Sequence, residues 1–546
     1  MNLFGEVLDA ETGKLLPARL YIQRRDGRWF FAESAASEGS AVHYKKQFEA
    51  GKDPVPSTGI EMHTTLSAHP FRVELTPGTY TITAEKGKEY HPWIKSIAIG
   101  TDKKKLTIKL KRWIDLSALD WYSGEIHSHR RVEDLPNLML AEDLNVTFPF
   151  TYWAHDILIP PCKSARRYIG MGNEIDQDVI SVDPTHVMYL MNTEFEPVLR
   201  TGKFQNACLG SMFFINHRSP FNQGVPPWRA TAERAHKEGA LIGFCKPCSA
   251  ASLMSLPIMK LDLYQVLDNM LWRSSGASFR WVNKASENDF LNFEQDAKGF
   301  TQWGYIDYGL RTYYALLNCG FRLQPMAGVA SGVMPNPLGF NRVYVHLPKG
   351  FSYQAWIQGL KEGRSFVTNG PMVFIRVDGC MPGHTLVQAG KAPRVYRLEG
   401  YAVNNAPLDR IEIIVNGQIV SRLKPENRKT ENAAFRSRIR KAIPIDRSSW
   451  IAVRCVEKRK DTSNRLAHTS PVHVDVKGRP LRPPRLEVKW LVQHLERDLT
   501  WLRDALPKKA WKEKCETECR DALRFYQNIY KRSLGSGGGL EHENLP

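Results

Sequence analysis

The pattern of apolar and polar residues divides the chain into regions of different structure. Up to about Arg112, short segments alternate apolar and polar residues around turns, as in GEVLDAETGKLLPARLYI and LTPGTYTITAEKGKEY. Alternation with a period of two is typical of strands that bury one face. The pattern predicts a small β-sandwich over residues 1–112.

Between residues 113 and 370, short apolar strands alternate with helical stretches. In ATAERAHKEGALIGF, for example, we expect a helix to end at Gly239 and a buried strand to follow it. This alternation predicts an α/β domain whose reactive residues lie at strand ends.

The remainder of the chain returns to strands and then becomes helical. Residues 371–480 include RIEIIVNGQIV, in which an Asn-Gly turn joins two strands, and they predict a second β-sandwich. Residues 481–534 show helical spacing in two segments joined at Pro507, which predicts a helical hairpin. Residues 535–546, rich in glycine, read as a flexible tail. The predicted fold class is therefore multidomain, α/β plus β.

Composition and charge narrow the class of protein. Hydrophobic residues make up 42% of the chain, and no apolar run reaches the roughly 18 residues of a membrane span, so a protein without a membrane span is expected. The formal charge of +18 favours anionic partners. Nucleic acid is an unlikely partner, because the Lys and Arg residues are not interleaved with aromatic ones as in a base-stacking platform. Nothing in the sequence fixes the oligomeric state.

The cysteines and the start of the chain bear on the compartment. Nine scattered cysteines argue against a disulfide framework. The first residues carry neither the charged nor the apolar part of a signal peptide. We therefore expect a cytoplasmic protein, or a secreted or periplasmic one whose leader was trimmed.

The strongest chemical signal is the His-Ser-His in WYSGEIHSHR, which spans Trp121–Arg130. His127 and His129 are two apart in a predicted strand, so their side chains project to the same face. Two neutral imidazoles on one face can bind a single metal ion. The alternative is that both histidines line the solvated side of an edge strand.

The segment GEIHSHR resembles the opening motif of the PHP (polymerase and histidinol phosphatase) metallohydrolase superfamily, and its CehA/McbA-like branch most closely. The resemblance continues through LMLAEDLNVTFPFTYW, LLNCGFRLQPMAGVASGVMPNPLGFNRVYVHL and QGLKEGRSFVTNGPM, over about residues 121–383. It implies a distorted β/α (PHP-type) barrel that holds divalent metals at its carboxyl strand ends. Hydrolysis by a metal-activated water is the implied chemistry. The N-terminal region resembles the carboxypeptidase-regulatory-like, transthyretin-like sandwiches.

The resemblance also implies a set of site residues. His155, Glu194 and His217 match further ligand positions, with Glu196 as an alternative to Glu194. Ala154 stands where a carboxylate is usual, so Asp156 is expected to substitute for it in the catalytic site.

Two later motifs depart from the family pattern. Cys245-Lys246-Pro247 stands in place of His-Pro, and AGVASGV stands in place of the closing Asp-x-His. The remaining ligands imply one or two divalent ions, with zinc, manganese and iron all acceptable. Lys246 is a catalytic candidate, as a cation that stabilises a developing oxyanion or as a general acid.

Two residues are candidates for substrate binding. Arg130 follows the histidine motif and could hold an anionic group. Asn269 ends LDLYQVLDN, where a site residue of an α/β barrel is expected. The expected partner is a small-molecule or glycan substrate. An anionic substrate would suit the positive charge of Arg130.

Three functions compete at this point. The leading hypothesis is a metal-dependent hydrolase that acts on an ester, an amide or carbamate, or a phosphoester. The departures from the motif leave open a non-catalytic metal- or glycan-binding protein with a degenerate site. The flanking sandwiches and aromatic residues such as Trp153, Trp272 and Trp303 suggest a third, a carbohydrate-active lyase or glycosidase that contains a metal.

Overall fold

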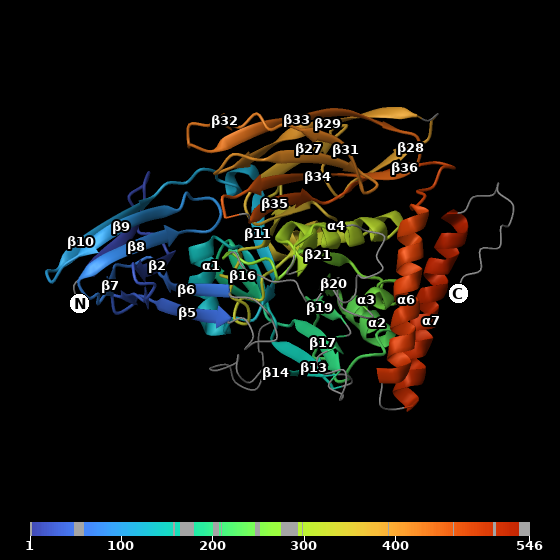
Figure 1. Ribbon diagram of the computed structural model, residues 1–546, viewed down its shortest axis with the longest axis horizontal. Helices are drawn as coiled ribbons and strands as arrows, with labels where there is room; N and C mark the ends of the chain where they lie inside the picture. The colour runs from blue at the N-terminus through green and yellow to red at the C-terminus, as the bar shows by residue number, and fades with distance from the viewer. Residues whose placement is uncertain are drawn as a thin grey trace.

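Strands predominate in the protein, and helices are interspersed among them, which confirms the prediction of a mixed α/β fold. In Figure 1 the N-terminal strands form the left end, later strands run along the top, and two long helices stand at the right of a central region. The computed structural model describes residues 3–48, 59–156, 159–163, 179–199, 207–208, 210–245, 252–274, 293–296, 299–390, 393–461, 463–505 and 509–533.

The first unit consists of two sheets that face each other across an apolar core. In the strand Gly78–Glu85, for example, alternate residues are buried, as the period-two pattern predicts. Leu20, Tyr80 and Ile108 are among the core side chains. One sheet has the order β10 (Lys104–Leu110), β1 (Leu3–Asp9), β7 (Phe71–Val73) and β4 (Glu33–Ser34). The other contains β5 (Ala41–Phe48), β6 (Gly59–Leu66), β2 (Ala18–Arg24), β8 (Gly78–Glu85), β9 (Trp93–Ile99) and β3 (Trp29–Phe30). We call this pair of sheets the N-terminal sandwich.

The central unit carries the histidine motif and is built from two further sets of strands. Parallel and antiparallel neighbours are mixed in both sets. The first set has the order β15 (Val179–Asp183), β16 (His186–Tyr189), β12 (Val146–Pro149), β11 (Trp121–Ser128), β25 (Arg342–His346) and β26 (Ser365–Thr368). The second has the order β14 (Cys162–Lys163), β13 (Tyr152–Asp156), β17 (Thr193–Leu199), β19 (Ser211–Ile215), β20 (Leu241–Cys245), β21 (Leu263–Leu267) and β24 (Gln324–Ala327), with β18 (Ala207–Cys208) beside β17.

Backbone hydrogen bonds link β11, in the first set, to residues next to β13 and to residues next to β24 in the second set. On one side Phe150 N donates to Ser128 O at 2.9 Å, where β12 leads into β13. On the other side, beyond β24, Ala330 N donates to His127 O at 2.7 Å. The strands therefore surround a shared core of fully buried apolar side chains, which includes Ile126, Phe213 and Ile242.

Helices connect and cover these strands. The predicted end of one helix is confirmed, because Gly239 adopts φ 86° directly after α2 and β20 begins two residues later. The helices of the central unit are α1 (Leu135–Glu142), α2 (Arg229–Glu238), α3 (Ser252–Met259), α4 (Gln302–Asn318) and α5 (Tyr353–Lys361), with short 3-10 turns η1 (Ser117–Leu119) and η2 (Val132–Asp134) and a small ribbon of β22 (Gln295–Asp296) and β23 (Gly299–Phe300).

The C-terminal sandwich shares a sheet with the central unit, because β26 pairs with β35. The predicted Asn-Gly hairpin is present, with Asn416 and Gly417 between β30 and β31. The shared sheet continues through β35 (Asn464–Thr469), β34 (Ser449–Lys458), β30 (Arg410–Val415) and β31 (Gln418–Leu423), with β36 (Val472–Val476) and β28 (Thr385–Gln388) at its side. The outer sheet has the order β27 (Met372–Val377), β29 (Arg394–Asn404), β33 (Phe435–Ile445) and β32 (Arg428–Lys429).

Two long helices, α6 (Arg485–Ala505) and α7 (Lys509–Ser533), pack against the central unit beside α2 and α3 (Figure 1). The Glu518 carboxylate accepts the backbone N–H groups of Trp228 and Arg229 at the start of α2, at 2.8 Å each. The helical pair thus covers this chain's own central core.

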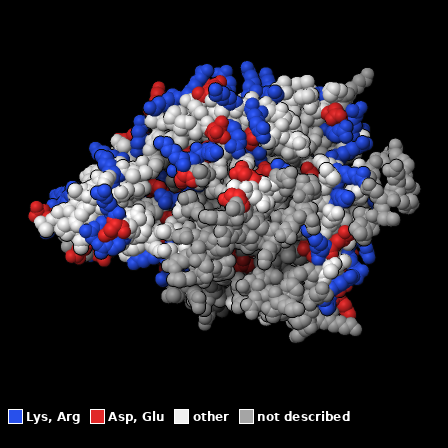
Figure 2. Space-filling model, in the orientation of Figure 1, with Lys and Arg blue, Asp and Glu red and all other residues white. Residues whose placement is uncertain are grey.

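Basic side chains are numerous on the outer surface of the C-terminal sandwich (Figure 2). Figure 2 shows many Lys and Arg side chains over the C-terminal sandwich. On β33, for instance, Arg436, Arg438 and Arg440 are all exposed.

None of the helices in the described ranges combines the length and hydropathy that a membrane crossing needs.

Candidate metal centre

Strand β11 delivers the two histidines into the interior of the central unit. Every residue of β11 is buried, because the strand has β12 on one side and β25 on the other. His127 is 1% exposed, and His129, one residue beyond the strand, is 5% exposed. Their Nε2 atoms lie 3.2 Å apart, so the two side chains converge on one point. This burial excludes the alternative of two solvated histidines on an edge strand.

A glycine-rich segment supports the backbone of this motif. It is the AGVASGV sequence, which stands where the resemblance implies an Asp-x-His. Gly328 lies so close that a Cβ there would come within 2.4 Å of His127 Cβ. A Cβ on Gly332, which has φ 104°, would come within 2.2 Å of His129 O. Ser331 contributes its carbonyl, which accepts a hydrogen bond from His129 N at 2.8 Å. The segment therefore positions the histidines through its backbone.

Glu194 completes the group from a different strand. It lies near the start of β17, opposite Trp153 of β13 and Phe213 of β19. Its two carboxylate oxygens lie 3.8 Å from His127 Nε2 and 3.0 Å from His129 Nε2. The Ser211 hydroxyl donates to Glu194 Oε1 at 2.9 Å, which fixes the orientation of the carboxylate. His127, His129 and Glu194 thus form a fully buried set of ligand atoms.

The spacing of these atoms fits a small divalent ion. In a tetrahedral site with bonds of about 2.0–2.1 Å to nitrogen and oxygen, neighbouring ligand atoms are about 3.3 Å apart. The three separations in the group, 3.2, 3.8 and 3.0 Å, lie around this value. Two imidazoles and one carboxylate are also the protein ligands of several catalytic zinc sites. Both the geometry and the donor chemistry of the group can accommodate a metal ion.

Aromatic side chains surround the histidines. The ring of Phe213 lies 4.5 Å from that of His127, and Phe150 lies 5.7 Å from both imidazoles. Trp153 lies 5.2 Å from His129. These rings give the group an apolar lining, and a low local dielectric strengthens charge interactions.

Glu125 is a buried carboxyl group on the same strand that the sequence analysis did not single out. It accepts backbone N–H groups from Val329 at 3.0 Å and from Gly339 at 2.5 Å. Burial raises the pKa of this carboxyl to about 8, against those two hydrogen bonds, which favour the charged form. Its place two residues before His127 was the available sequence signal, since alternate residues of a strand share a face. Glu125 ties the glycine-rich segment to β11.

The structure does not bring His217 into the group. His217 is fully buried, with Nε2 at 2.9 Å from the Thr193 hydroxyl and Nδ1 at 3.0 Å from the Ser219 carbonyl. A carbonyl only accepts, so Nδ1 carries the proton and Nε2 accepts from Thr193. Burial lowers the pKa of this imidazole to about 4, which keeps it neutral. Both ring nitrogens therefore have protein partners. One partner is Thr193, the residue before Glu194, and neither nitrogen bonds the Glu194 carboxylate.

Three other predicted site residues are only partly visible or fall outside the described structure. His155 and Asp156 belong to β13, whose neighbour is the β17 strand of Glu194, but their side chains lie outside the described part of the chain. Lys246 lies wholly outside it. The alternative carboxylate, Glu196, is half-buried and is not among the atoms that converge with the histidines in the described structure.

The two predicted substrate-binding residues are both buried. The Arg130 guanidinium stacks on Tyr44 of the N-terminal sandwich, 4.4 Å from the ring centre. Asn269 follows β21 and is 1% exposed, and its side-chain oxygen has no hydrogen-bond partner among the described residues. A buried polar atom without a partner is unusual in folded proteins, and an ordered water or an ion can account for it. Asn269 stays a candidate, as does Arg130.

Comparisons of the chain with protein-family models, with curated proteins and with solved structures found no match in any of the three.

Proposed function

We propose that this protein is a metal-dependent hydrolase whose ion is held by His127, His129 and Glu194. The observation that carries the proposal is the convergence of two imidazole nitrogens and a carboxylate in one buried group. The resemblance of GEIHSHR to the opening motif of the PHP superfamily supports the same function. We place the ion among zinc, manganese and iron, because nitrogen and carboxylate ligands suit all three.

The residues around the group have distinct tasks under this proposal. A bound divalent ion would lower the pKa of water towards neutrality and polarise the scissile bond of an ester, an amide or carbamate, or a phosphoester. Ser211 holds the Glu194 carboxylate towards the histidines through its hydrogen bond to Oε1. Phe150, Phe213 and Trp153 limit access of bulk water. His155, Asp156 and Lys246 remain proposed members of the site, whereas His217 bonds Thr193 and Ser219 and is not assigned to the ion.

Turnover of a substrate panel tests the proposal. Chromogenic phosphoesters, carboxylic esters, carbamates and amides are offered to the protein after chelation and after zinc, manganese or iron is returned. We expect hydrolysis of at least one class only with metal present, and its loss in Glu194→Gln. Glu61→Gln, which changes a buried glutamate of the N-terminal sandwich, is the matched control.

Two outcomes would count against a hydrolase. The first is full metal occupancy without turnover of any class, which would favour a non-catalytic binding protein. The second is turnover that survives in the variant His127→Ala/His129→Ala.

A further inference from the structure

A second candidate site lies where the N-terminal sandwich, the central unit and the C-terminal sandwich meet. A cavity of about 410 Å³ is lined there by residues from all three units. Its volume is within the range of small-molecule sites, roughly 300–1,000 Å³. None of its lining residues belongs to the proposed metal centre.

Some of the cations at this cavity have acidic partners. Glu85 accepts from Arg19 at 2.6 Å and from Arg273 at 2.7 Å, so one carboxylate serves two guanidinium groups. Arg459 lies 3.8 Å from Glu457. These pairs account for the acidic side chains nearest to the cavity, apart from Asp461, which binds Ser463.

Two further cations have no acidic partner in the part of the chain that the structure describes. Lys88 Nζ donates to the backbone carbonyl of Asn369 at 3.1 Å, and Arg465 Nη2 donates to the carbonyl of Arg273 at 3.0 Å. Both lie over the ring of Phe340, at 4.0 and 4.7 Å from its centre. Arg465 is 5% exposed, and its Nη1 has no hydrogen-bond partner among the described residues. No carboxylate of the described chain lies within ion-pair distance of either cation.

The local potential is therefore positive. Burial lowers the pKa of Lys88 well below its ordinary value, and Arg342, Arg465 and Arg19 lower it further, while Glu85 acts in the opposite direction. Burial, together with Arg459 and Arg273, likewise lowers the pKa of Arg465 to about 10, while Glu457 and Asp461 act in the opposite direction. Placing an anion near both groups would favour their charged forms.

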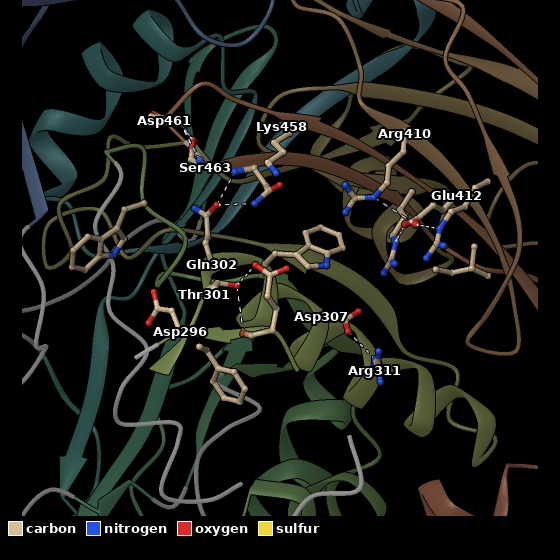
Figure 3. A pocket seen from close by; sticks show the side chains of 18 of the residues that line it. Asp296, Thr301, Gln302, Asp307, Arg311, Arg410, Glu412, Lys458, Asp461 and Ser463 are labelled. Atoms are coloured by element: carbon tan, nitrogen blue, oxygen red, sulfur yellow. Dashed lines mark hydrogen bonds and ion pairs between the residues drawn. The ribbon is translucent and has the colours of Figure 1, made fainter. Parts of the chain in front are cut away.

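In another cavity of the same molecule, the arginines are paired with carboxylates of the chain. This cavity has about 880 Å³ between the start of α4 and the C-terminal sandwich (Figure 3). There Arg454 and Arg422 bind Glu412 at 2.5 and 3.0 Å. Arg311 binds Asp307 at 2.8 Å, as the dashed line in Figure 3 marks. These arginines bind acidic residues of the chain itself, whereas Lys88 and Arg465 pair with none of the acidic residues that the structure describes.

We propose that the cavity at Lys88 and Arg465 is an anion-binding site for a small molecule that carries an oxyanion, either a phosphate or a carboxylate group. A guanidinium group with a free Nη1 and an ammonium group beside it are suited to such an anion. The bound molecule would bridge the two sandwiches, because Lys88 comes from the N-terminal sandwich and Arg465 from β35 of the C-terminal sandwich. Ligand binding should therefore raise the thermal stability of the whole chain.

Isothermal titration of the full chain tests the proposal, with inorganic phosphate, pyrophosphate and citrate as probes. Chloride at the same ionic strength serves as the reference, since salt screens exposed charges. We expect saturable binding of at least one oxyanion and a rise in Tm, neither of which chloride reproduces. Preference for the phosphate probes would identify a phosphorylated ligand, and preference for citrate a carboxylate ligand. Equal behaviour of all probes and chloride would overturn the proposal.

Single substitutions locate the binding. Lys88→Met and Arg465→Met keep an apolar side chain on Phe340 and remove one charge each. Loss of a charged hydrogen bond should weaken oxyanion binding by about 10- to 100-fold. Arg422→Met removes an arginine from the other cavity and should leave the affinity unchanged. Oxyanion affinity that falls equally in all three variants, or in none, would contradict the assignment.

Discussion

Two buried groups of this molecule combine histidine with glutamate, and they have different chemistry. In the N-terminal sandwich, His63 Nδ1 lies 2.7 Å from Glu61 Oε1, and both residues come from β6. The Tyr21 hydroxyl donates to the same oxygen at 2.5 Å, and Arg273 lies 4.0 Å from Oε2. In the central unit, two imidazoles from β11 and its end meet the carboxylate of Glu194 from β17.

The difference shows what makes a candidate metal centre. Glu61 lies near an arginine and accepts hydrogen bonds from a phenol and from its one histidine, so it belongs to a structural network with a single imidazole. Glu194 is approached by two Nε2 atoms that also face each other at 3.2 Å, which places three ligand atoms around one point. Contact between histidine and glutamate is therefore not sufficient. Convergence of several ligand atoms from separate strands distinguishes the second group.

Replacement of Glu194 by glutamine should have the largest effect on metal binding, and the same replacement of Glu61 is the comparison. Glu194→Gln removes a ligand charge, so we expect the affinity for zinc to fall by more than the roughly 10- to 100-fold that loss of an outer partner costs. Glu61→Gln should leave the affinity unchanged. Competition titration with a chromogenic chelator measures both. Equal affinities in the two variants would remove the distinction between the groups.

Gly328→Ala should displace His127 and so disturb the group of His127, His129 and Glu194. The new Cβ would lie 2.4 Å from His127 Cβ, so the end of β11 must shift. Overpacking of this kind costs about 1–3 kcal/mol, and displacement of His127 should also weaken metal binding. Gly100→Ala is the control, because its Cβ would meet no atom within 4 Å. Urea denaturation and metal titration that fail to separate the two variants would contradict the supporting role of Gly328.

The His63 network should make the free energy of unfolding depend on pH. Burial lowers the pKa of His63 from 6.5 to about 4, so between these values the unfolded chain binds the proton and the folded chain does not. Stability is therefore lost as the pH falls from 6.5 towards 4. At pH 5 this group should account for about 2 kcal/mol relative to pH 7.

The comparison for this prediction is His63→Asn, whose amide can still donate to Glu61. The variant should lose less stability than the wild type between pH 7 and pH 5 in urea denaturation. Identical pH dependence of the two proteins would mean that His63 is not held neutral.

Ser211→Ala should have the smallest effect. It removes the hydroxyl that donates to Glu194 Oε1 at 2.9 Å but leaves all three ligands in place. Loss of such an outer partner should weaken metal binding by about tenfold, at the lower end of the usual range. The exposed Ser117→Ala is the control, and an affinity equal to the control would show that Ser211 does not orient Glu194.

Features set by neighbours in the sequence could be predicted. The end of α2 at Gly239, the Asn416–Gly417 hairpin and the shared face of His127 and His129 each depend on a few adjacent residues. Glu194 was named from a resemblance, and Glu196, on the same face of the strand, could have taken its place. Only the register of β17 against β13 and β19 resolves that choice, and register depends on strands far apart in the chain.

Features assembled over long distances could not be predicted. The support of His127 by Gly328 joins residues two hundred positions apart, and the pair of Lys88 and Arg465 over Phe340 joins all three units. His217 illustrates the opposite case. Its position in sequence matched a ligand motif, whereas hydrogen bonds to Thr193 and Ser219 occupy both of its ring nitrogens.

Elemental analysis of the purified protein tests the central claim most directly. The wild type, His127→Ala/His129→Ala and His63→Asn are loaded with zinc or manganese, freed of excess metal and measured by mass spectrometry. The account predicts that the wild type and His63→Asn retain the ion, while the double variant retains none above background. Retention of the same amount of metal by the double variant would contradict it.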